Sequence, residues 1–324
     1  MSKFFLRWID SWSDAVQTQS VHPDSAYKIQ WLRILPFILL HLACLAVFWV
    51  GVSKFAVCFM LFFYVIRMFA ITAFFHRYLS HKTFQTSRFV QFIFILIGTM
   101  SAQRGPLWWA AHHRYHHRFT DTENDPHSST HGFWYSHVGW FLNDQNFKIR
   151  KEVVKDWLKY PELIWLDRFS LPIVLLTAAA IYALGEWLAF AYPDFQTTGP
   201  QLLVWGFVIS TVCLIHATLC INSLAHLYGS RDFDTQDQSR NNLLLSIMTL
   251  GEGWHNNHHF YAGSTRQGFY WWQIDVTYYL LKILSCFGLV WGLKPVPKRI
   301  YAASRRNLSE ISISSKKLKN GDFS

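Results

Sequence analysis

The sequence predicts an all-α integral membrane protein in which four apolar helices support a polar, histidine-rich helical cap. Three observations lead to this fold class. Four apolar runs each approach the roughly 20 residues that a helix needs to cross a bilayer core of roughly 30 Å. Histidines gather in clusters beside the ends of these runs. Hydrophobic residues make up 51% of the 324 residues, and the mean hydropathy of +0.12 exceeds that of ordinary soluble domains.

The N-terminal half begins with residues 1–30, where aromatic side chains recur at helical spacing among polar ones. This pattern indicates an interfacial amphipathic segment or a short packing helix, and not a secretory signal. The first two predicted spans cover about residues 31–50 and 55–75, joined by a tight connector at 51–54. Residues 83–104 are apolar only in part, so they predict a re-entrant or interfacial helix and not a further span.

The second pair of predicted spans covers about residues 171–192 and 202–224. The connector between them, residues 193–200, has no Lys or Arg, whereas segments 76–168 and 226–300 are basic. The positive-inside rule therefore places the cap (76–168 and 226–300) and both termini in the cytoplasm. Within the cap, residues 271–293 predict an amphipathic helix. The membrane domain then spans residues 31–301, followed by a Ser/Lys-rich tail, 302–324, that we expect to be disordered.

The formal charge of +10 does not indicate nucleic-acid binding, because the basic residues flank apolar runs and form no basic domain of their own. The five cysteines lie in apolar surroundings without a C-x-x-C pair, so we expect free thiols in a reducing compartment.

Three histidine clusters carry the chemistry. Residues three and four apart share a helix face, and two of the clusters repeat these offsets. His76 and His81 are five apart, about 140° around a regular helix. The helix must therefore end or bend between them, or each must reach a different ion. The candidate ligands are His76, His81, His113, His116, His117, His226, His255, His258 and His259, with Asn222 four residues before His226.

Nine imidazoles are too many for one ion, but two ions with four or five nitrogens each would use them all. Adjacent residues such as His116 and His117 point about 100° apart, so each could serve a separate ion. Asn222 could complete the coordination sphere of the ion that has only four nitrogens, directly or through water. Imidazole suits zinc, copper, iron and nickel, and zinc has no redox chemistry. A two-ion, all-nitrogen site in a membrane protein therefore indicates iron and dioxygen.

Other polar residues near the clusters have ordinary alternatives. Glu252 and Asp125 are candidates for orienting ligand imidazoles, or are surface and capping residues. We expect structural roles for the remaining histidines, His22, His41, His112, His127, His131, His137 and His216.

Over roughly residues 31–300 the chain resembles the membrane fatty acyl desaturases, in particular the acyl-CoA delta-9 (stearoyl-CoA type) branch. The resemblance rests on Ile71-Thr72-Ala73 before the first cluster, Asp125-Pro126-His127, Ser136-His137-Val138-Gly139-Trp140, Asn222-Ser223-Leu224-Ala225-His226 and Gly251-Glu252-Gly253-Trp254-His255. It implies four transmembrane helices and a cytosolic cap that holds two iron ions. It also implies that the nine histidines are the ligands, with Asn222 binding through water.

The reaction implied is the O2-dependent insertion of a cis double bond into a long-chain saturated acyl-CoA. A narrow bent channel would present one pair of methylenes to the iron ions. The resemblance maps the bend onto Trp109 and Thr218. Met68 and Tyr64, 8 and 12 residues before His76, would lie about 12 and 18 Å below the metals. Either could stop the methyl end of the chain.

One departure concerns the head group. In animal acyl-CoA members the two residues before His113 are Arg and Asp, whereas here they are Ala111 and His112. Gln103, Arg104 and the basic cap could still receive CoA phosphates, an acyl carrier protein or a phospholipid head. We expect a separate electron donor, a ferredoxin or a cytochrome b5-like protein with its reductase, because the chain has no haem-binding extension and no cluster-type cysteine set.

Two alternatives remain. A histidine-box membrane hydroxylase would share the metal site and yield an alcohol, and a metal transporter would place ligands inside its spans. The compact chain favours a bacterial inner membrane over the endoplasmic reticulum.

Overall fold

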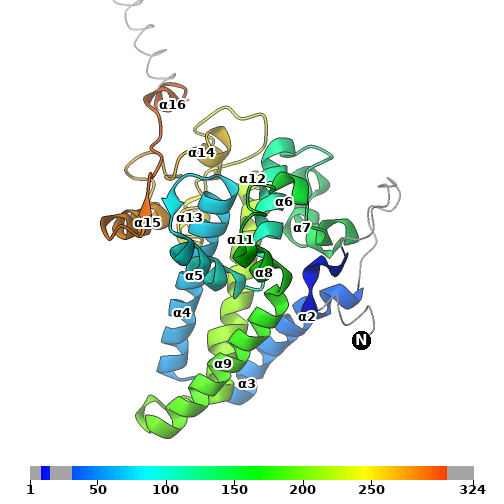
Figure 1. The fold of residues 1–324 in the computed structure, drawn as a ribbon, viewed down its shortest axis with the longest axis vertical. Coiled ribbons are helices and arrows are strands. Elements are labelled where there is room, and N and C mark those ends of the chain that lie inside the picture. The colour runs from blue at the N-terminus through cyan, green and yellow to red at the C-terminus, as the bar shows by residue number, and fades with distance from the viewer. Residues whose placement is uncertain (1–8, 15–30, 305–324) are drawn as a thin grey trace, which may run out of the picture.

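The computed structural model describes residues 9–14 and 31–304, which form an elongated and mostly helical molecule (Figure 1). Long helices make up its lower half, and short helices and loops form the cap above them. The predicted helical class is confirmed. A small antiparallel pair of strands, β1 (Gln85–Thr86) and β2 (Val290–Trp291), is the one sheet among the described residues. Most of the predicted interfacial segment, and the tail from residue 305, lie outside them.

Three helices are long and apolar enough to cross a membrane: Lys54–Ser80, Ser170–Ala191 and Gly199–Leu227. The first comprises α4 (Lys54–Phe69) and η4 (Ala70–Ser80), and the second is α9 (Ser170–Ala191). The third comprises α10 (Gly199–Gln201), η10 (Leu202–Ile209), α11 (Ser210–Asn222) and α12 (Leu224–Leu227).

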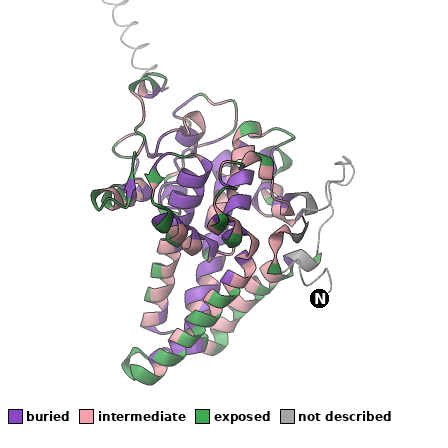
Figure 2. Ribbon diagram, viewed as in Figure 1, coloured by how far each residue is buried: buried purple, intermediate pink, exposed green. Residues whose placement is uncertain are grey.

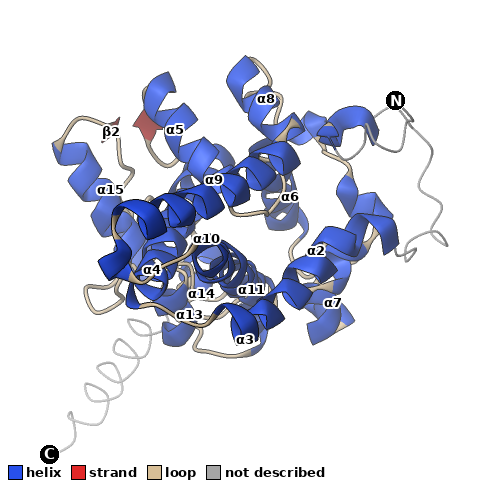
Figure 3. Ribbon diagram, turned by 90° about the horizontal axis from the view of Figure 1, so that it is seen from below, coloured by secondary structure: helices blue, strands red, loops and turns tan. Residues whose placement is uncertain are grey.

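The first predicted run is instead built from shorter pieces: α2 (Trp31–Ala43), η3 (Cys44–Ala46) and α3 (Val47–Val50). Its apolar part, Ile34–Val50, is shorter than the other three helices. Seen from below, α11 lies among α2, α4 and α9 (Figure 3), and the η10–α11 helix contacts α2, α4 and α9.

The outer faces of the lower helices are exposed, whereas the interior of the cap is buried (Figure 2). Large apolar side chains such as Phe48 and Phe190 lie on these exposed faces. In water such a surface would be unfavourable, so the pattern fits a lipid-facing belt.

Both hairpin connectors lie at the same end of the molecule. Ser53, which caps α4, shares a 2.6 Å hydrogen bond with Thr197 of the second connector. The Trp205 indole also donates to the Gly51 carbonyl at 2.8 Å. The two connectors therefore lie together on one side of the molecule.

Arg67 is fully buried within the α4 span, and its guanidinium is satisfied by neighbours. It donates to the hydroxyls of Thr211 and Ser210, both at 2.7 Å. A charged group within a membrane span requires such partners. Arg67 therefore joins α4 to α11.

The cap consists of short elements. They are η1 (Ser11–Asp14), α5 (Arg88–Thr99), α6 (Pro106–Phe119), η5 (Ser129–His131), α7 (Phe133–His137), η6 (Gly139–Leu142), η7 (Asp144–Phe147), η8 (Lys151–Val153), α8 (Pro161–Arg168), α13 (Leu243–Met248), α14 (His255–Phe260), α15 (Val276–Cys286) and α16 (Lys298–Ala302). A further short helix, η9 (Pro193–Phe195), lies in the second hairpin connector. With 12 residues, α5 is about 18 Å long, too short to span, as expected of an interfacial helix.

The predicted amphipathic helix over residues 271–293 is wrong in its bounds. The helix there begins only at Val276, because Asp275 caps it by accepting from Tyr278 N at 3.0 Å. After it ends at Cys286, Gly288 turns the chain with a φ of 67° into β2.

α6 carries His113, His116 and His117, and a residue distant in the sequence fixes its N-terminus. Asp167 of α8 accepts hydrogen bonds from Leu107 N and Trp108 N at 2.7 and 2.8 Å. Such a carboxylate satisfies the free N–H groups at a helix start. A Cβ at Gly105 would lie 2.1 Å from the Asp167 carboxylate, so this close approach requires glycine.

Candidate metal centre

The nine predicted histidines gather into two clusters within the cap. In each, the ring nitrogens that face one another lie within 4.8 Å. The first cluster comprises His76, His81, His113, His117 and His258, and the second His116, His226, His255 and His259. The sequence neighbours His116 and His117 therefore belong to different clusters, which agrees with the angle of about 100° between adjacent residues on a helix. His258 and His259 also belong to different clusters.

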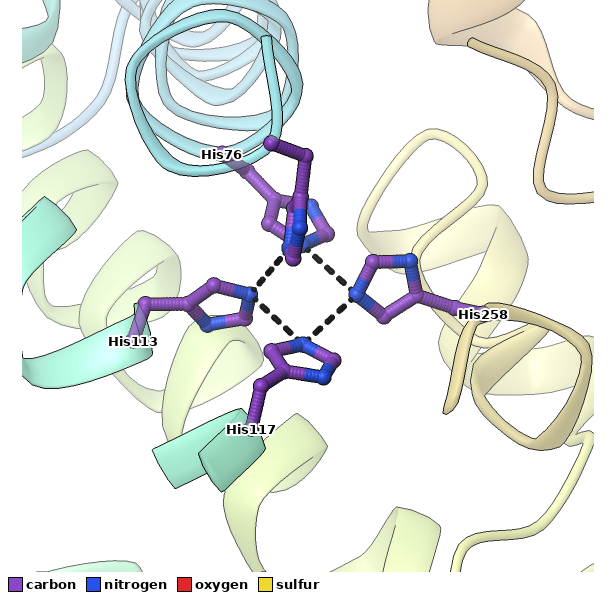
Figure 4. Close-up of side chains that lie close together, drawn as sticks. His76, His113, His117 and His258 are labelled. Atoms are coloured by element: carbon purple, nitrogen blue, oxygen red, sulfur yellow. Dashed lines mark hydrogen bonds between the residues drawn. The ribbon is translucent and has the colours of Figure 1, made fainter. Parts of the chain in front are cut away.

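The rings of the first cluster meet through their Nε2 atoms. Figure 4 shows His76, His113, His117 and His258 pointing to one centre from η4, α6 and α14. Neighbouring Nε2 atoms are 2.8–3.0 Å apart. Nitrogens held at about 2.1 Å from one ion would be about 3.0 Å apart at right angles and about 3.4 Å apart at the tetrahedral angle. The spacing therefore fits one ion.

His76 and His81 lie in the same cluster because the chain between them is wound as a π-helix. The His81 N–H donates to the His76 carbonyl, five residues back, at 3.2 Å. In a π-helix that offset closes one turn, so the two rings share a face. The helix ends at Ser80, as one of the two expected alternatives required, and both rings belong to one cluster and not to two.

Four carboxylates pair with the Nδ1 atoms of four of these imidazoles. Asp125 accepts from His116 Nδ1 at 2.9 Å, and Glu252 pairs with His76 Nδ1. Both residues were candidates for this role, and their position agrees with it. The sequence analysis missed the other two. Asp121 lies 3.0 Å from His226 Nδ1, and Asp237 lies 2.9 Å from His259 Nδ1.

These carboxylates fix the protonation of the rings. A carboxylate only accepts hydrogen bonds, so each of these imidazoles carries its proton on Nδ1. In the neutral ring form that binds metals, His116, His226 and His259 therefore turn Nε2 lone pairs toward the centre of the second cluster. His116 Nε2 and His259 Nε2 lie 3.4 Å apart, and two bare nitrogen lone pairs cannot hydrogen-bond to each other. A cation between them satisfies both, so the side chains present fit a metal ion.

The pKa shifts agree with this electrostatic picture. Burial lowers the pKa of His113, His117 and His258 well below the ordinary value, and neighbouring imidazoles add to the shift. The neutral ring is the form that binds metals. Burial alone would raise the pKa of Asp237, but its hydrogen bond and attraction to His259 outweigh burial and hold that pKa below the ordinary range.

The Glu252 carboxylate belongs to a larger buried network. Arg77 Nη2 donates to it at 3.0 Å, and Gln267 Nε2 donates to it at 3.1 Å. Arg77 also pairs with Asp275 at 2.9 Å. This network joins η4 to the segment 252–275, which contains His255, His258 and His259. The orientation of His76 therefore depends on residues from several parts of the chain.

Two adjoining cavities run past the clusters. The first, about 120 Å³, is walled by aromatic residues of the cap. The second, about 40 Å³, leads toward Met68 on α4. Both are lined by Trp109, His113, Thr218 and Asn222. The two residues expected at the channel bend, Trp109 and Thr218, therefore lie where the cavities meet.

The other predicted substrate residues lie around these cavities. Gln103 joins the bend residues, since it donates to Thr218 Oγ1 at 2.9 Å and accepts from Trp109 Nε1 at 3.3 Å. Arg104 lines the first cavity, with its guanidinium 4.9 Å from the Trp108 ring. Met68 lines the second cavity. Tyr64 instead donates its hydroxyl to the Met248 carbonyl at 2.6 Å.

Asn222 is half-buried and lines both cavities beside His113, but it contributes to neither cluster of facing nitrogens. Asn222 therefore lies at the wall that the two cavities share.

The remaining histidines have other neighbours. His41, His216 and His137 form a chain of hydrogen bonds, at 2.9 and 3.0 Å, that joins α2, α11 and α7. His127 is buried against His116, with ring centroids 4.2 Å apart, and is closer to the second cluster than the sequence indicated. His22 lies outside the described residues.

Comparison with known proteins identifies related chains. The fatty acid desaturase family model matches residues 53–285. The acyl-CoA 5-desaturase AL21 of Anemone leveillei is 37% identical over 86% of this chain and 86% of its own length. The delta-9 acyl-lipid desaturase 2 of Arabidopsis thaliana is 36% identical over 83% of each chain. The sn-1 stearoyl-lipid 9-desaturase of Anabaena variabilis is 32% identical over 84% of this chain and 96% of its own.

Proposed function

Since the chain belongs to the fatty acid desaturase family, we propose that it inserts a cis double bond, at the delta-9 position, into long-chain saturated acyl-CoA in an O2-dependent reaction. One observation carries this proposal: histidine clusters with unprotonated nitrogens lie beside apolar cavities. No side-chain acid or base can cleave an unactivated C–H bond, so a redox cofactor must lie next to the hydrocarbon.

We assign two iron ions to the two clusters, and the nine histidines as their ligands, with Asn222 acting through water. The imidazole set suits iron. When bound, the ions supply with O2 the oxidising power that removes two hydrogens from adjacent methylenes. The carboxylates of Asp121, Asp125, Asp237 and Glu252 keep the Nδ1 protons in place and so orient the Nε2 lone pairs.

The protein's own contribution is position. The hydrogen bonds from Trp109 to Gln103 and from Gln103 to Thr218 fix the wall between the cavities. Trp109 also stacks on His113 with ring centroids 5.1 Å apart, so the bend and a ligand move as one unit. A rigid bend holds one pair of methylenes in the conformer that yields cis geometry.

We place the four spans, including the broken helix over 31–50, in a membrane with the cap in the cytoplasm, and prefer the bacterial inner membrane. A separate donor supplies electrons. With a formal charge of +10, the chain would attract an acidic carrier such as a ferredoxin or a cytochrome b5-like protein with its reductase.

Two alternatives remain, one for the substrate and one for the product. Some of the relatives are acyl-lipid and others acyl-CoA desaturases, acting at position 5 or 9. An acyl-lipid substrate is therefore one alternative to acyl-CoA, and an acyl-carrier-protein substrate, expected from the sequence alone, is another. A membrane hydroxylase with the same metal site is the alternative for the product, and its alcohol separates it from an alkene.

Expression in a host that lacks its own desaturase tests the function. We expect monounsaturated acyl chains whose double bond, located by mass spectrometry of the lipids, lies between C9 and C10. The protein purified from that host should contain two iron ions per chain. Absence of any alkene in iron-loaded protein supplied with electrons, or an alcohol product, would refute the proposal.

A further inference from the structure

Residues 10–12 contact helix α8, although they lie far from it in the sequence. Ser11 Oγ donates to the Asp167 carbonyl at 2.8 Å, and Trp12 Nε1 donates to the Asp167 carboxylate at 2.6 Å. The Arg168 guanidinium donates to the Asp10 carboxylate at 3.1 Å. The paired residues are 155–158 positions apart. We call residues 10–12 the N-terminal strap.

The Asp167 carboxylate joins the strap to α6. Its Oδ1 atom accepts from the backbone N–H groups of Leu107 and Trp108, and its Oδ2 atom accepts from Trp12. Burial raises the pKa of Asp167, and the hydrogen bond from Trp12 opposes that rise. A buried carboxylate oxygen that loses its donor is unfavourable. The Trp12 N–H therefore stabilises the ionised carboxylate in the orientation that α6 needs.

α6 depends on this carboxylate because its own N-cap, Gly105, has no side chain with which to cap the helix. The helix carries three of the nine clustered histidines: His113 and His117 belong to the first cluster, and His116 to the second. Its first turns also carry Trp109, which stacks on His113 and lines both cavities. A small rotation of α6 would therefore move residues of both clusters and of the cavity bend together.

We propose that the N-terminal strap positions the metal centre, with Trp12 acting through Asp167 to fix the rotation of α6 about its own axis. A helical side chain reaches about 5–6 Å from the axis, so a rotation of about 10° would move a ring by about 1 Å. A misplacement of this size can cost about 10²-fold in rate. The inference rests on the proposed function only for the identity of the metal.

The strap is itself held from a second side. Lys151 Nζ lies 3.8 Å from the centroid of the Trp12 ring, and the ring packs against the main hydrophobic core of the cap. An indole that only filled space would affect stability alone. A positioning role predicts in addition a weaker hold on the metal at temperatures far below the Tm, so the two roles have different readouts.

Iron retained against a chelator by the purified, iron-loaded full-length protein measures that hold. Trp12→Phe keeps an aromatic ring in the core and removes the N–H. We expect it to lower iron affinity about 3- to 10-fold, less than the roughly 10- to 100-fold loss from removing a direct partner of a ligand.

Two control variants separate positioning from packing. Ser11→Ala removes a bond to the backbone carbonyl of Asp167 and leaves the carboxylate contacts intact, so it should bind iron as wild type does. Ile95→Ala truncates a fully buried core residue of α5. It should lower the Tm and leave iron affinity unchanged. An equal loss of iron in Ile95→Ala would assign the Trp12 effect to packing and overturn the inference.

A double-mutant cycle tests whether Trp12 acts through Asp167. In Asp167→Asn the amide can still accept from α6 through its oxygen, but its NH2 group then faces the Trp12 N–H, so the strap contact is already broken. Adding Trp12→Phe to that variant should change iron affinity less than twofold. Full additivity of the two changes would contradict the route through the carboxylate.

A measurement on the wild-type protein needs no variant to fold. Because coupling between two sites is reciprocal, bound iron should slow hydrogen exchange at the Trp12 backbone N–H, which donates to Asp10 Oδ1 at 3.0 Å, by the same factor of about 3 to 10. Identical exchange with and without iron would overturn the inference. The proposed function fails separately: protein that shows this coupling but makes no alkene refutes desaturation and leaves the role of the strap standing.

Discussion

Met68 lines the second cavity, so its truncation should change which chain length the enzyme prefers. The side chain is 1% exposed and lines the cavity on the side away from the cap. Met68→Ala removes the three heavy atoms beyond Cβ and makes room for about two methylenes. Each buried methylene contributes about 0.8 kcal/mol. Preference for a 20-carbon over an 18-carbon chain should therefore rise about 15-fold in relative kcat/KM.

The assay is a competition among palmitoyl-, stearoyl- and arachidoyl-CoA at equal concentration, with products quantified by mass spectrometry. Because Met→Ala in a core also costs about 2–5 kcal/mol of stability, the product ratio and not the total activity is the readout. Met100→Ala is the matched control. Met100 packs against the same hydrophobic core but is not among the residues that line either cavity.

Two results would contradict this reasoning. A product ratio for Met68→Ala within twofold of wild type would show that Met68 does not limit the chain. An equal shift in Met100→Ala would show that any loosening of the core lengthens the preferred substrate.

Three further predictions concern metal retention and stability. Asp237→Asn weakens the hydrogen bond that orients His259 and should lower metal affinity about 10- to 100-fold, measured as iron retained against a chelator; unchanged retention would contradict it. Asp167→Ala removes the cap of α6 and should cost about 1–2 kcal/mol, seen as a lower Tm; an equal Tm would refute the capping role. Asp156 pairs with Arg114. Burial would raise its pKa, but hydrogen bonds from Arg114 and Lys82 lower it. Its contribution, about 1 kcal/mol, is therefore present above the unfolded pKa near 3.9 and is lost below it. The Tm difference between wild type and Asp156→Asn should be constant from about pH 7 to about pH 5 and shrink as the pH falls below about 4, and a difference independent of pH would exclude the charge.

Local pattern was sufficient for much of the architecture. The apolar runs over residues 55–75, 171–192 and 202–224 correspond to long helices, because hydrophobic length is a property of contiguous residues. Helical offsets likewise assigned His116 and His117 to different clusters, since the angle between adjacent residues is fixed within one helix.

Where local rules compete with packing, the sequence prediction was incomplete. An α-helix would separate His76 from His81, but residues 70–80 form a π-helix. This form is costly in isolation, and here both rings reach one centre through it. The helix predicted to begin at Trp271 begins at Val276 because Asp275 both caps it and pairs with Arg77, 198 positions away.

The sequence by itself determined the candidate ligand types, the number of histidines and the apolar segments that carry them. These follow from residue identity and from spacing along one helix. Only the tertiary structure decided which carboxylates orient the rings. Asp121 precedes His226 by 105 positions, and Asp237 is 22 positions from His259. Only folding brings His112 Nε2 and Trp140 Nε1 to one cavity wall, where neither has a hydrogen-bond partner among the described residues. A hydrogen bond forms between atoms that folding brings together, and no periodicity in the chain encodes that distance.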